Sequence, residues 1–171
     1  TRRLSGFFSE FGFMKYRLEV ELKYFIFLNK LLENREVISR ENEILEILNN
    51  FSVEHCQRIK DIEVTCNHDV KSVEYFIREK FVELNLEKFN QFIHFGLTSQ
   101  DINNTAITKS IRDYLECEYI PTLKKIIEDI NEKANFYKEI VMLSRTHGQP
   151  AVPSTLGKEF RVFSYRIEKQ L

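Results

Sequence analysis

The chain has 171 residues, of which 25 are Lys or Arg and 26 are Asp or Glu, so its formal net charge is −1. Apolar residues make up 43% of the chain and charged residues 30%, a composition that is typical of a globular protein and excludes a disordered one. A charge so close to zero disfavours nucleic acid or an anionic membrane as a partner. No apolar run approaches the roughly 20 residues of a membrane span. Three cysteines without a Cys-x-x-Cys pair indicate reduced thiols in a cytoplasmic protein.

In the first half of the chain, apolar residues recur at three- and four-residue steps and predict four helices. The first begins after Ser9, whose side chain is a suitable N-cap, and runs to Leu32. The second covers residues 41–50, the third begins after Ser52, and the fourth follows Asp69. The side chains expected to face the core are Phe11, Met14, Leu18, Leu22, Phe25, Leu28, Leu32, Ile44, Leu45, Leu48, Cys56, Ile59, Ile62, Val70, Val73, Phe76, Ile77 and Phe81.

In the second half, residues 85–99 break the helical pattern and are expected to form a connection. A hydroxyl at Thr98 followed by an acid at Asp101 predicts the start of the next helix. Pro121 marks either a kink or a fresh helix start, after which apolar residues again step by three and four. The inward side chains of these helices are expected to be Ile102, Ala106, Ile107, Ile111, Tyr114, Leu115, Leu123, Ile126, Ile127, Ile130, Ala134 and Tyr137.

The last part of the chain begins with residues 141–143, which are expected to be extended. Residues 144–153 hold one glycine and two prolines and are expected to form a loop, and no pattern in the chain predicts a β-hairpin. A final helix begins near Ser154 or Thr155. Its expected inward side chains are Phe160, Phe163, Ile167 and Leu171. These elements predict an all-α fold in which the later, long amphipathic helices form part of a bundle.

Polar residues concentrate at three places where the helical pattern fails: residues 67–69 (Asn-His-Asp), residues 98–104 and residues 144–150. Each is expected at a helix terminus, where unpaired N–H groups can bind anions. The first two clusters are also good capping sequences and the third is also a common turn, so a structural role and a site are alternatives at each. His147, beside a glycine, is a candidate general acid or base. His94 is expected to be a satisfied core or hinge histidine, and no spacing of His and Cys indicates a metal site.

Three blocks of the sequence together resemble a known enzyme family. Residues 67–76, 92–104 and 143–159 are similar to motifs of the adenylosuccinate lyases of the bacterial type, which share the fumarase/aspartase fold. The third block, with its run Thr-His-Gly-Gln-Pro-Ala-Val-Pro-Ser-Thr, is the most specific. The resemblance extends from Phe7 to Leu171, which is nearly the whole chain.

The resemblance implies a β-elimination that releases fumarate, with no metal or organic cofactor. The two family reactions convert adenylosuccinate to AMP and the succinylo-carboxamide ribotide of purine synthesis (SAICAR) to the free carboxamide (AICAR). By motif match, His147 would be the general acid that protonates the leaving nitrogen. Thr98 and Ser99 would bind the succinyl carboxylates. The other residues implied to lie beside the substrate are Asn67, His68 and Asp69, on the nucleotide side, and Thr146 and Gln149.

The resemblance also implies an organisation for the chain. Residues 1–88 would form an N-terminal helical domain, and residues 89–171 the first part of a central helical bundle. The family's catalytic serine lies in a Gly-Ser-Ser-x-Met-Pro-x-Lys-x-Asn loop that does not occur in these 171 residues, so we expect a fragment that is inactive alone. The family also implies a homotetramer with shared active sites that act on a small nucleotide. Another lyase of the superfamily, or a non-catalytic helical assembly module, is the alternative.

Overall fold

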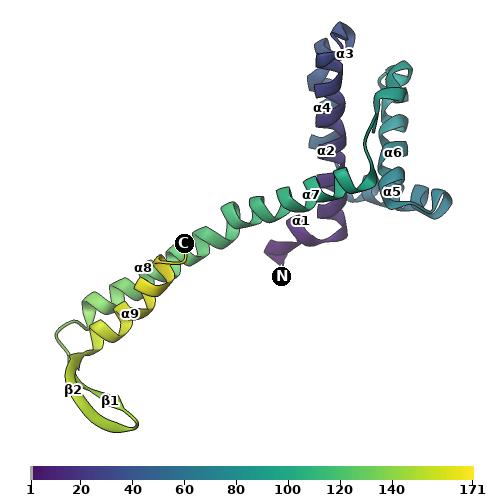
Figure 1. Cartoon of the computed structure of the whole chain (residues 1–171). Helices are drawn as coiled ribbons and strands as arrows, with labels where there is room; N and C mark the ends of the chain where they lie inside the picture. Colours follow the sequence, from purple (N-terminus) through teal and green to yellow (C-terminus); the bar gives the residue numbers. More distant parts are fainter. Residues whose placement is uncertain (1) are drawn as a thin grey trace. The chain divides into compact units, whose positions relative to one another are not determined.

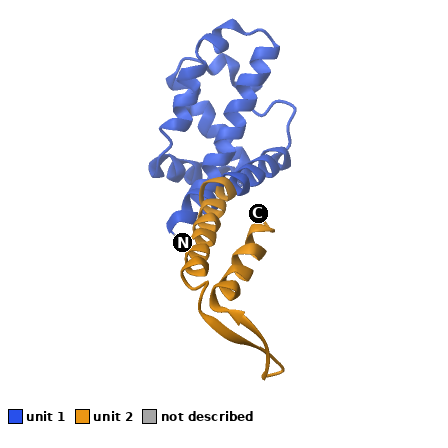
Figure 2. Ribbon diagram, turned by 90° about the vertical axis from the view of Figure 1, so that its left-hand side faces the viewer, with its two compact units in different colours: residues 1–113 blue, residues 114–171 orange. Residues whose placement is uncertain are grey.

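The computed structural model describes residues 2–171, which form two compact units (Figures 1 and 2). The first unit ends at Asp113 and the second covers Tyr114–Leu171. Helices make up most of both units, and the second also contains a small antiparallel sheet. No helix within residues 2–171 is both long enough and apolar enough to cross a membrane.

The first unit is a group of helices arranged around one long helix, α2. In chain order its helices are η1 (Arg2–Leu4), α1 (Ser5–Phe8), α2 (Glu10–Leu31), α3 (Arg35–Ser39), α4 (Glu41–Asn49), α5 (Val53–Cys66), α6 (Asp69–Glu83), η2 (Glu87–Phe92) and α7 (Ser99–Tyr114). The helices α3, α4, α5 and α6 all pack against α2. The four helices expected in the first half of the chain are confirmed, while the short α3 was not expected.

Side-chain caps explain where several of these helices begin. Ser9 accepts a hydrogen bond from the Gly12 N–H at 3.1 Å and so caps α2, as predicted. Ser52 caps α5 in a reciprocal arrangement, in which its hydroxyl accepts from the His55 N–H and the His55 ring accepts from the Ser52 N–H. Asn67 ends α5 with a positive φ of 53°, a conformation that asparagine tolerates better than most residues.

The core of the first unit lies where α2 meets α4, α5 and α6. Phe25 of α2 and Phe81 of α6 meet edge to face, with ring centroids 4.8 Å apart. Leu32 was expected to face inward but is 49% exposed, because it lies just beyond the end of α2. The predicted core positions that are buried are Met14, Leu18, Leu22, Phe25, Ile44, Ile59, Ile62, Val70, Val73, Phe76, Ile77 and Phe81.

The second unit is a helical hairpin with a β-hairpin inserted between its two helices. Its elements are the π-helical turn η3 (Leu115–Tyr119), α8 (Ile120–Phe136), β1 (Val141–Thr146), β2 (Gln149–Thr155) and α9 (Leu156–Glu168). Pro121 lies in the first turn of α8, but the π-helical turn η3 runs directly into it and Tyr119 and Ile120 are already helical, so the helix does not begin anew there. The proline instead coincides with a local widening of the helix to π geometry. Thr155 caps α9, as expected, by accepting a hydrogen bond from the Lys158 N–H at 3.2 Å.

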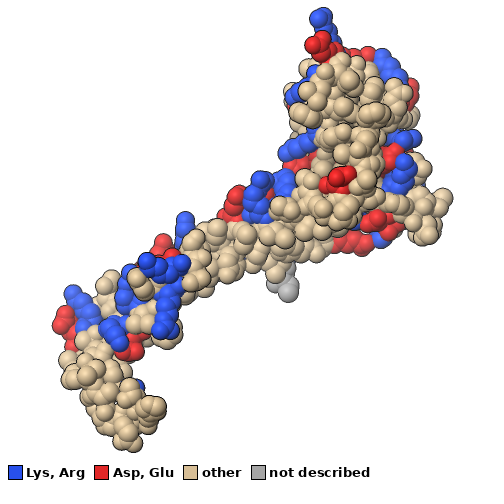
Figure 3. All heavy atoms as spheres, in the orientation of Figure 1, with Lys and Arg blue, Asp and Glu red and all other residues tan. Residues whose placement is uncertain are grey.

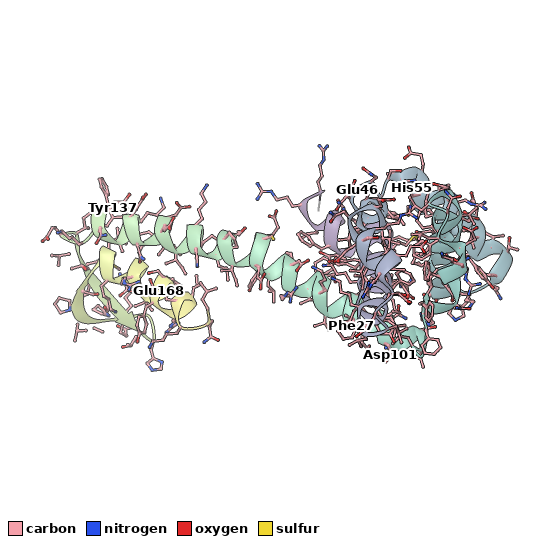
Figure 4. The ribbon with its side chains drawn as sticks, turned by 90° about the horizontal axis from the view of Figure 1, so that it is seen from above. Phe27, Glu46, His55, Asp101, Tyr137 and Glu168 are labelled. Atoms are coloured by element: carbon pink, nitrogen blue, oxygen red, sulfur yellow. The ribbon has the colours of Figure 1, made fainter. Side chains whose placement is uncertain are left out.

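Close backbone packing joins α9 to the end of α8. A Cβ atom on Gly157 would lie 2.6 Å from the Cα of Lys138 and would also collide with the Ala134 carbonyl oxygen. Glycine is therefore required at this point. Farther along α9, Arg161 pairs with Glu168 at 2.8 Å and also donates to Asn131 of α8. Glu168 is labelled in Figure 4. Phe163 and Leu171 were expected to face inward but are 59% and 49% exposed within this pair of helices.

The β-hairpin occupies the segment for which we expected a loop, so that prediction is wrong, whereas the predicted helical fold class is confirmed, since helices make up most of the described residues. The strands β1 and β2 are antiparallel, with Thr146 paired to Gln149 and a register shift between Leu143 and Arg145. His147 and Gly148 form the turn and both have positive φ, 50° and 72°, as a type I′ turn requires. A sheet of two strands has only edges, and prolines are tolerated there. Pro150 and Pro153 misled the prediction for that reason.

Charged side chains are distributed differently over the two hairpins of the second unit. In Figure 3 basic and acidic atoms are interspersed over the visible faces of α8 and α9, whereas the β-hairpin is almost free of them. In the sequence, Arg145 is the one Lys, Arg, Asp or Glu residue among residues 141–155. The β-hairpin therefore presents His147 in a nearly uncharged setting.

Candidate functional site

The three polar clusters found in the sequence fall into two groups. Residues 67–69 and 98–104 belong to the first unit, and residues 144–150 belong to the second. The first two clusters lie at the starts of α6 and α7, as predicted. The third lies in the β-hairpin and not at a helix terminus, which corrects the prediction for that cluster.

Within the first unit, the start of α6 meets the start of α7 through His68 and Ser99. His68 is the N-cap of α6, and its Nδ1 accepts a hydrogen bond from the Lys71 N–H at 3.1 Å. Because Nδ1 acts as an acceptor, the proton of the neutral ring lies on Nε2. Nε2 is 3.3 Å from Oγ of Ser99 and donates to it. The side chain of His68 is 48% exposed, so this pair is open to a ligand.

A buried arginine lies behind this pair, and no pattern in the sequence assigned a role to it. Arg17 of α2 is 7% exposed, and one of its Nη atoms forms an ion pair with Asp69. Its Nε donates to Oδ1 of Asn103 on α7 at 2.9 Å. The face of Phe13 lies 4.2 Å from the guanidinium carbon, a cation–π distance.

Asp69 is negatively charged in this setting, and the causes can be named. Burial raises the pKa of its carboxyl, but the Arg17 charge, the Val70 N–H and the nearby His68 together outweigh burial and hold that pKa below its usual value. Asp69 is 47% exposed, so one side of the carboxylate remains accessible. The start of α6 thus offers an exposed imidazole and an exposed carboxylate side by side.

Thr98 and Asp101 form the capping arrangement that the sequence left as one alternative. Both the N–H and the hydroxyl of Thr98 donate to Oδ2 of Asp101, at 2.7 and 2.8 Å. These hydrogen bonds, the backbone one foremost, hold the pKa of Asp101 below its usual value. The groups of Thr98 expected to bind an anion are therefore occupied by a carboxylate of the chain itself.

A second buried charge of α2 contacts His94. Glu21 is fully buried, and its Oε1 lies 2.5 Å from Nδ1 of His94, whose φ is 58°. The other oxygen of Glu21 is buried without a hydrogen-bond partner. Burial raises the pKa of Glu21, and Glu74 adds to that effect, whereas His94 acts in the opposite direction. His94 is thus a satisfied histidine as expected, but its buried partner was missed.

A cavity of about 480 Å³ lies between α2 and α7 of the first unit. Phe27 and Asp101, which lie near each other in Figure 4, both line it. Tyr24, Leu97 and Ile102 provide much of the rest of its wall. The residues of the His68–Ser99 pair do not line it, although Asp101 of the 98–104 cluster does.

In the second unit, Thr146, His147 and Gln149 lie together at the tip of the β-hairpin. All three are exposed, and Thr146 and Gln149 face each other across the register. Exposure leaves the His147 imidazole free to exchange protons with a ligand. Within residues 2–171, no group of three or more His, Cys, Asp and Glu side chains is placed to hold a metal ion.

Comparison with known proteins places the chain in a family. The model of the lyase family matches residues 1–171. The chain belongs to this family. It is 49% identical to the adenylosuccinate lyase of Dictyostelium discoideum over 98% of its length, and 43% and 41% identical to those of Vibrio cholerae and Escherichia coli K12 over 99% and 98%. The chain spans about 38% of the length of each of these relatives.

Solved structures show the same fold for this lyase chain. A fumarate lyase from Mesorhizobium sp. BNC1 matches 99% of the chain and 38% of its own length, with a TM-score of 0.75 and 20% identity. The β-carboxy-cis,cis-muconate cycloisomerase of Acinetobacter calcoaceticus matches the same shares with a TM-score of 0.73 and 19% identity. At such identities the likeness establishes the mainly helical fold of the family and nothing about the substrate.

Proposed function

We propose that the protein carrying this chain is an adenylosuccinate lyase that releases fumarate from adenylosuccinate, to give AMP, and from SAICAR, to give AICAR. The observation that carries the proposal is the 49% identity with the Dictyostelium adenylosuccinate lyase over nearly the whole chain. The three polar blocks that resemble the family's motifs support it, because they contain an imidazole, hydroxyls and a carboxylate suited to this chemistry. The proposal includes the cytoplasm as the site of action, to which the free cysteines of the described residues are suited.

In the proposed reaction a base removes a proton from the carbon β to the nitrogen. The electron pair of that C–H bond forms the new double bond of fumarate, and the C–N bond breaks with its pair going to the nitrogen. We assign to His147 the role of general acid that protonates this leaving nitrogen. Its exposed position on a narrow hairpin supports the assignment, since the ring can reach into a bound substrate. Thr146 and Gln149, beside it, are proposed to contact the substrate.

The cluster of the first unit is proposed to bind rather than to react. We assign Ser99 and Thr98 to the succinyl carboxylates, for which the start of α7 is a favourable place. Because Asp101 occupies both polar groups of Thr98, a substrate carboxylate must displace it or bind through Ser99 first. We assign Asn67, His68 and Asp69 to the nucleotide side, where the exposed imidazole and carboxylate of α6 can accept and donate hydrogen bonds.

We further propose that the whole protein is a homotetramer with active sites shared between subunits. The second unit supports an oligomer, because its helices expose large apolar side chains such as Ile126, Phe136 and Phe163. In this proposal residues 1–88 form an N-terminal domain and residues 89–171 begin a central helical bundle. The alternative is a non-catalytic helical assembly module, which would also form an oligomer but would not catalyse the reaction.

The experiment is an absorbance assay of the whole protein with adenylosuccinate and, separately, SAICAR. We expect fumarate and AMP in equal amounts from the first substrate and fumarate with AICAR from the second. Argininosuccinate is the control for another lyase chemistry of the superfamily and is expected to remain intact. A folded oligomer that releases fumarate from neither purine substrate would contradict the proposal and favour the assembly module.

A further inference from the structure

Arg17 is an unusual residue for the position it occupies. It lies in the middle of α2 with 7% of its surface exposed, whereas arginine is rarely buried unless its charge is paired. Every partner that the structure gives it supports the charged form: the Asp69 carboxylate, the Asn103 carbonyl oxygen and the face of Phe13. A buried charge with such a complete set of partners is costly to arrange and indicates a specific structural task.

The partners of Arg17 belong to the two helix starts that carry the candidate site. Asp69 directly follows His68, the N-cap of α6. Asn103 lies four residues after Ser99 on α7, and residues four apart share one face of a helix. Arg17 therefore joins the residue next to His68 to the residue one turn from Ser99.

Two parallel connections thus link the start of α6 to α7. One is direct, from Nε2 of His68 to Oγ of Ser99 at 3.3 Å. The other runs from Asp69 through the guanidinium of Arg17 to Asn103. The direct contact is long and exposed, whereas the contacts of Arg17 are shorter, partly buried and charge-assisted, so the second connection is the stronger of the two.

We propose that Arg17 is a positioning residue that fixes the separation of His68 and Ser99, and thereby the shape of the substrate-binding cluster. This inference rests on the proposed function for its catalytic consequence, although the link itself is a property of the fold. Lysine cannot replace it fully, because one ammonium group lacks the planar fork that reaches Asp69 and Asn103 from separate nitrogens. A displacement of about 1 Å at a substrate-binding group can lower the rate about 10²-fold.

The test compares Arg17→Met and Arg17→Lys with Arg58→Met in the whole protein. Arg58 is a matched control, because it also pairs with a carboxylate, Glu79, but is exposed and away from the cluster. We expect Arg17→Met to lower kcat/KM about 10²-fold, mainly through KM, and Arg17→Lys to lower it by a smaller factor. We expect Arg58→Met to remain within about twofold of the wild type, since exposed ion pairs contribute little.

Hydrogen exchange provides a readout that does not depend on activity. We expect the amides of segments 67–73 and 97–104 to exchange faster in Arg17→Met than in Arg58→Met. One of these amides is the Lys71 N–H, which donates a hydrogen bond to His68. Arg17→Lys should restore part of the protection. If Arg17→Met fails to fold, Arg17→Lys and Asn103→Ala test the positioning role instead. We expect each of them to lose protection in both segments.

The outcomes separate this inference from the proposed function. Unchanged protection of both segments in the Arg17 variants, or a kcat/KM within twofold of the wild type in Arg17→Met, would overturn the positioning role. A wild type that releases no fumarate would instead overturn the proposed function, and the exchange rates would still decide whether Arg17 joins the two helix starts. Equal loss of protection across the whole first unit would also count against positioning, since it would indicate general destabilisation.

Discussion

The two units hold their polar residues in opposite ways. In the first unit the cluster of His68, Asp69 and Ser99 is supported by the buried charge of Arg17 on α2, and each member has a side-chain partner. In the second unit His147 stands at the tip of a hairpin that is fixed by backbone pairing and by its turn geometry. Substitutions in the first unit should therefore change binding and stability together. Substitutions of His147 at the hairpin tip should change chemistry alone.

The largest expected effect is the loss of the proposed acid. We expect His147→Asn to lower kcat about 10²–10⁴-fold, the usual contribution of a positioned general acid. Asparagine suits a positive φ before glycine, so this change preserves the hairpin and removes only the proton donor. His147→Ala should lose turnover to a similar extent. Rates of fumarate release and unfolding curves check both variants, and a kcat within a few-fold of the wild type would remove His147 from its role.

The next effect concerns Ser99 in the first unit. We expect Ser99→Ala to weaken binding of the succinyl half of the substrate by about 1.5–3 kcal/mol, since a hydrogen bond to a charged group is lost. Ser110→Ala is a matched control on the same helix, because its buried hydroxyl donates only to the Ile107 carbonyl oxygen. Titration with adenylosuccinate and with fumarate measures the change. Unaltered affinity for both ligands would leave Ser99 as a helix-start residue only.

A purely structural effect is expected at Gly157 in the second unit. Gly157→Ala places a methyl group against the backbone of Lys138 and Ala134. It should lower the free energy of unfolding by about 1–3 kcal/mol, the usual cost of overpacking. Gly148→Ala is an informative companion, because it has open space around it but a positive φ of 72°. Thermal unfolding distinguishes them. A wild-type melting temperature in Gly157→Ala would show that α8 and α9 do not approach as described.

The smallest expected effect is a pH dependence that comes from Glu21. Its pKa is raised in the folded state, so its stabilising contribution is fully present below its unfolded pKa and is lost as pH rises through the folded pKa. The groups that face it are His94 and Glu74, and Glu74 in turn pairs with Lys71 and Arg78.

We therefore expect Glu21→Gln to flatten the fall in stability with rising pH, by at most about 1.4 kcal/mol per pH unit. Urea unfolding at a series of pH values measures the slope. Glu79→Gln, an exposed partner of Arg58, is the control and should leave the slope unchanged. An identical slope in Glu21→Gln would mean that burial does not govern this carboxyl.

Much of the first unit was predictable because its signals are local. The caps at Ser9 and Ser52, and the apolar positions of α6, follow from spacing within one helix. Arg17 and Glu21 were missed because the core was predicted from apolar residues only. A signal did exist, since Arg17 is three residues after Met14, and Glu21 is three after Leu18, so both lie on the apolar stripe of α2.

The site was only partly predictable for a related reason. The sequence identified the starts of α6 and α7 as polar helix termini, but which residues meet there depends on how the helices pack. The pairing of His68 with Ser99, 31 positions apart, is of this long-range kind. The hairpin was missed because two prolines count against a strand unless it is an edge, and a two-stranded sheet has no other kind. His-Gly is also a weaker turn signal than Asn-Gly.

The most direct test of the central claim, that the first unit binds the substrate and the second unit supplies the acid, is calorimetric titration of adenylosuccinate into His147→Asn. This variant should form a complex that does not turn over. We expect the dissociation constant of adenylosuccinate from this variant to lie within about threefold of the dissociation constant of a non-reacting analogue from the wild type. Adding Ser99→Ala to the variant should raise its dissociation constant about 10-fold or more. Loss of binding in His147→Asn alone, or no further loss on adding Ser99→Ala, would contradict this division of roles.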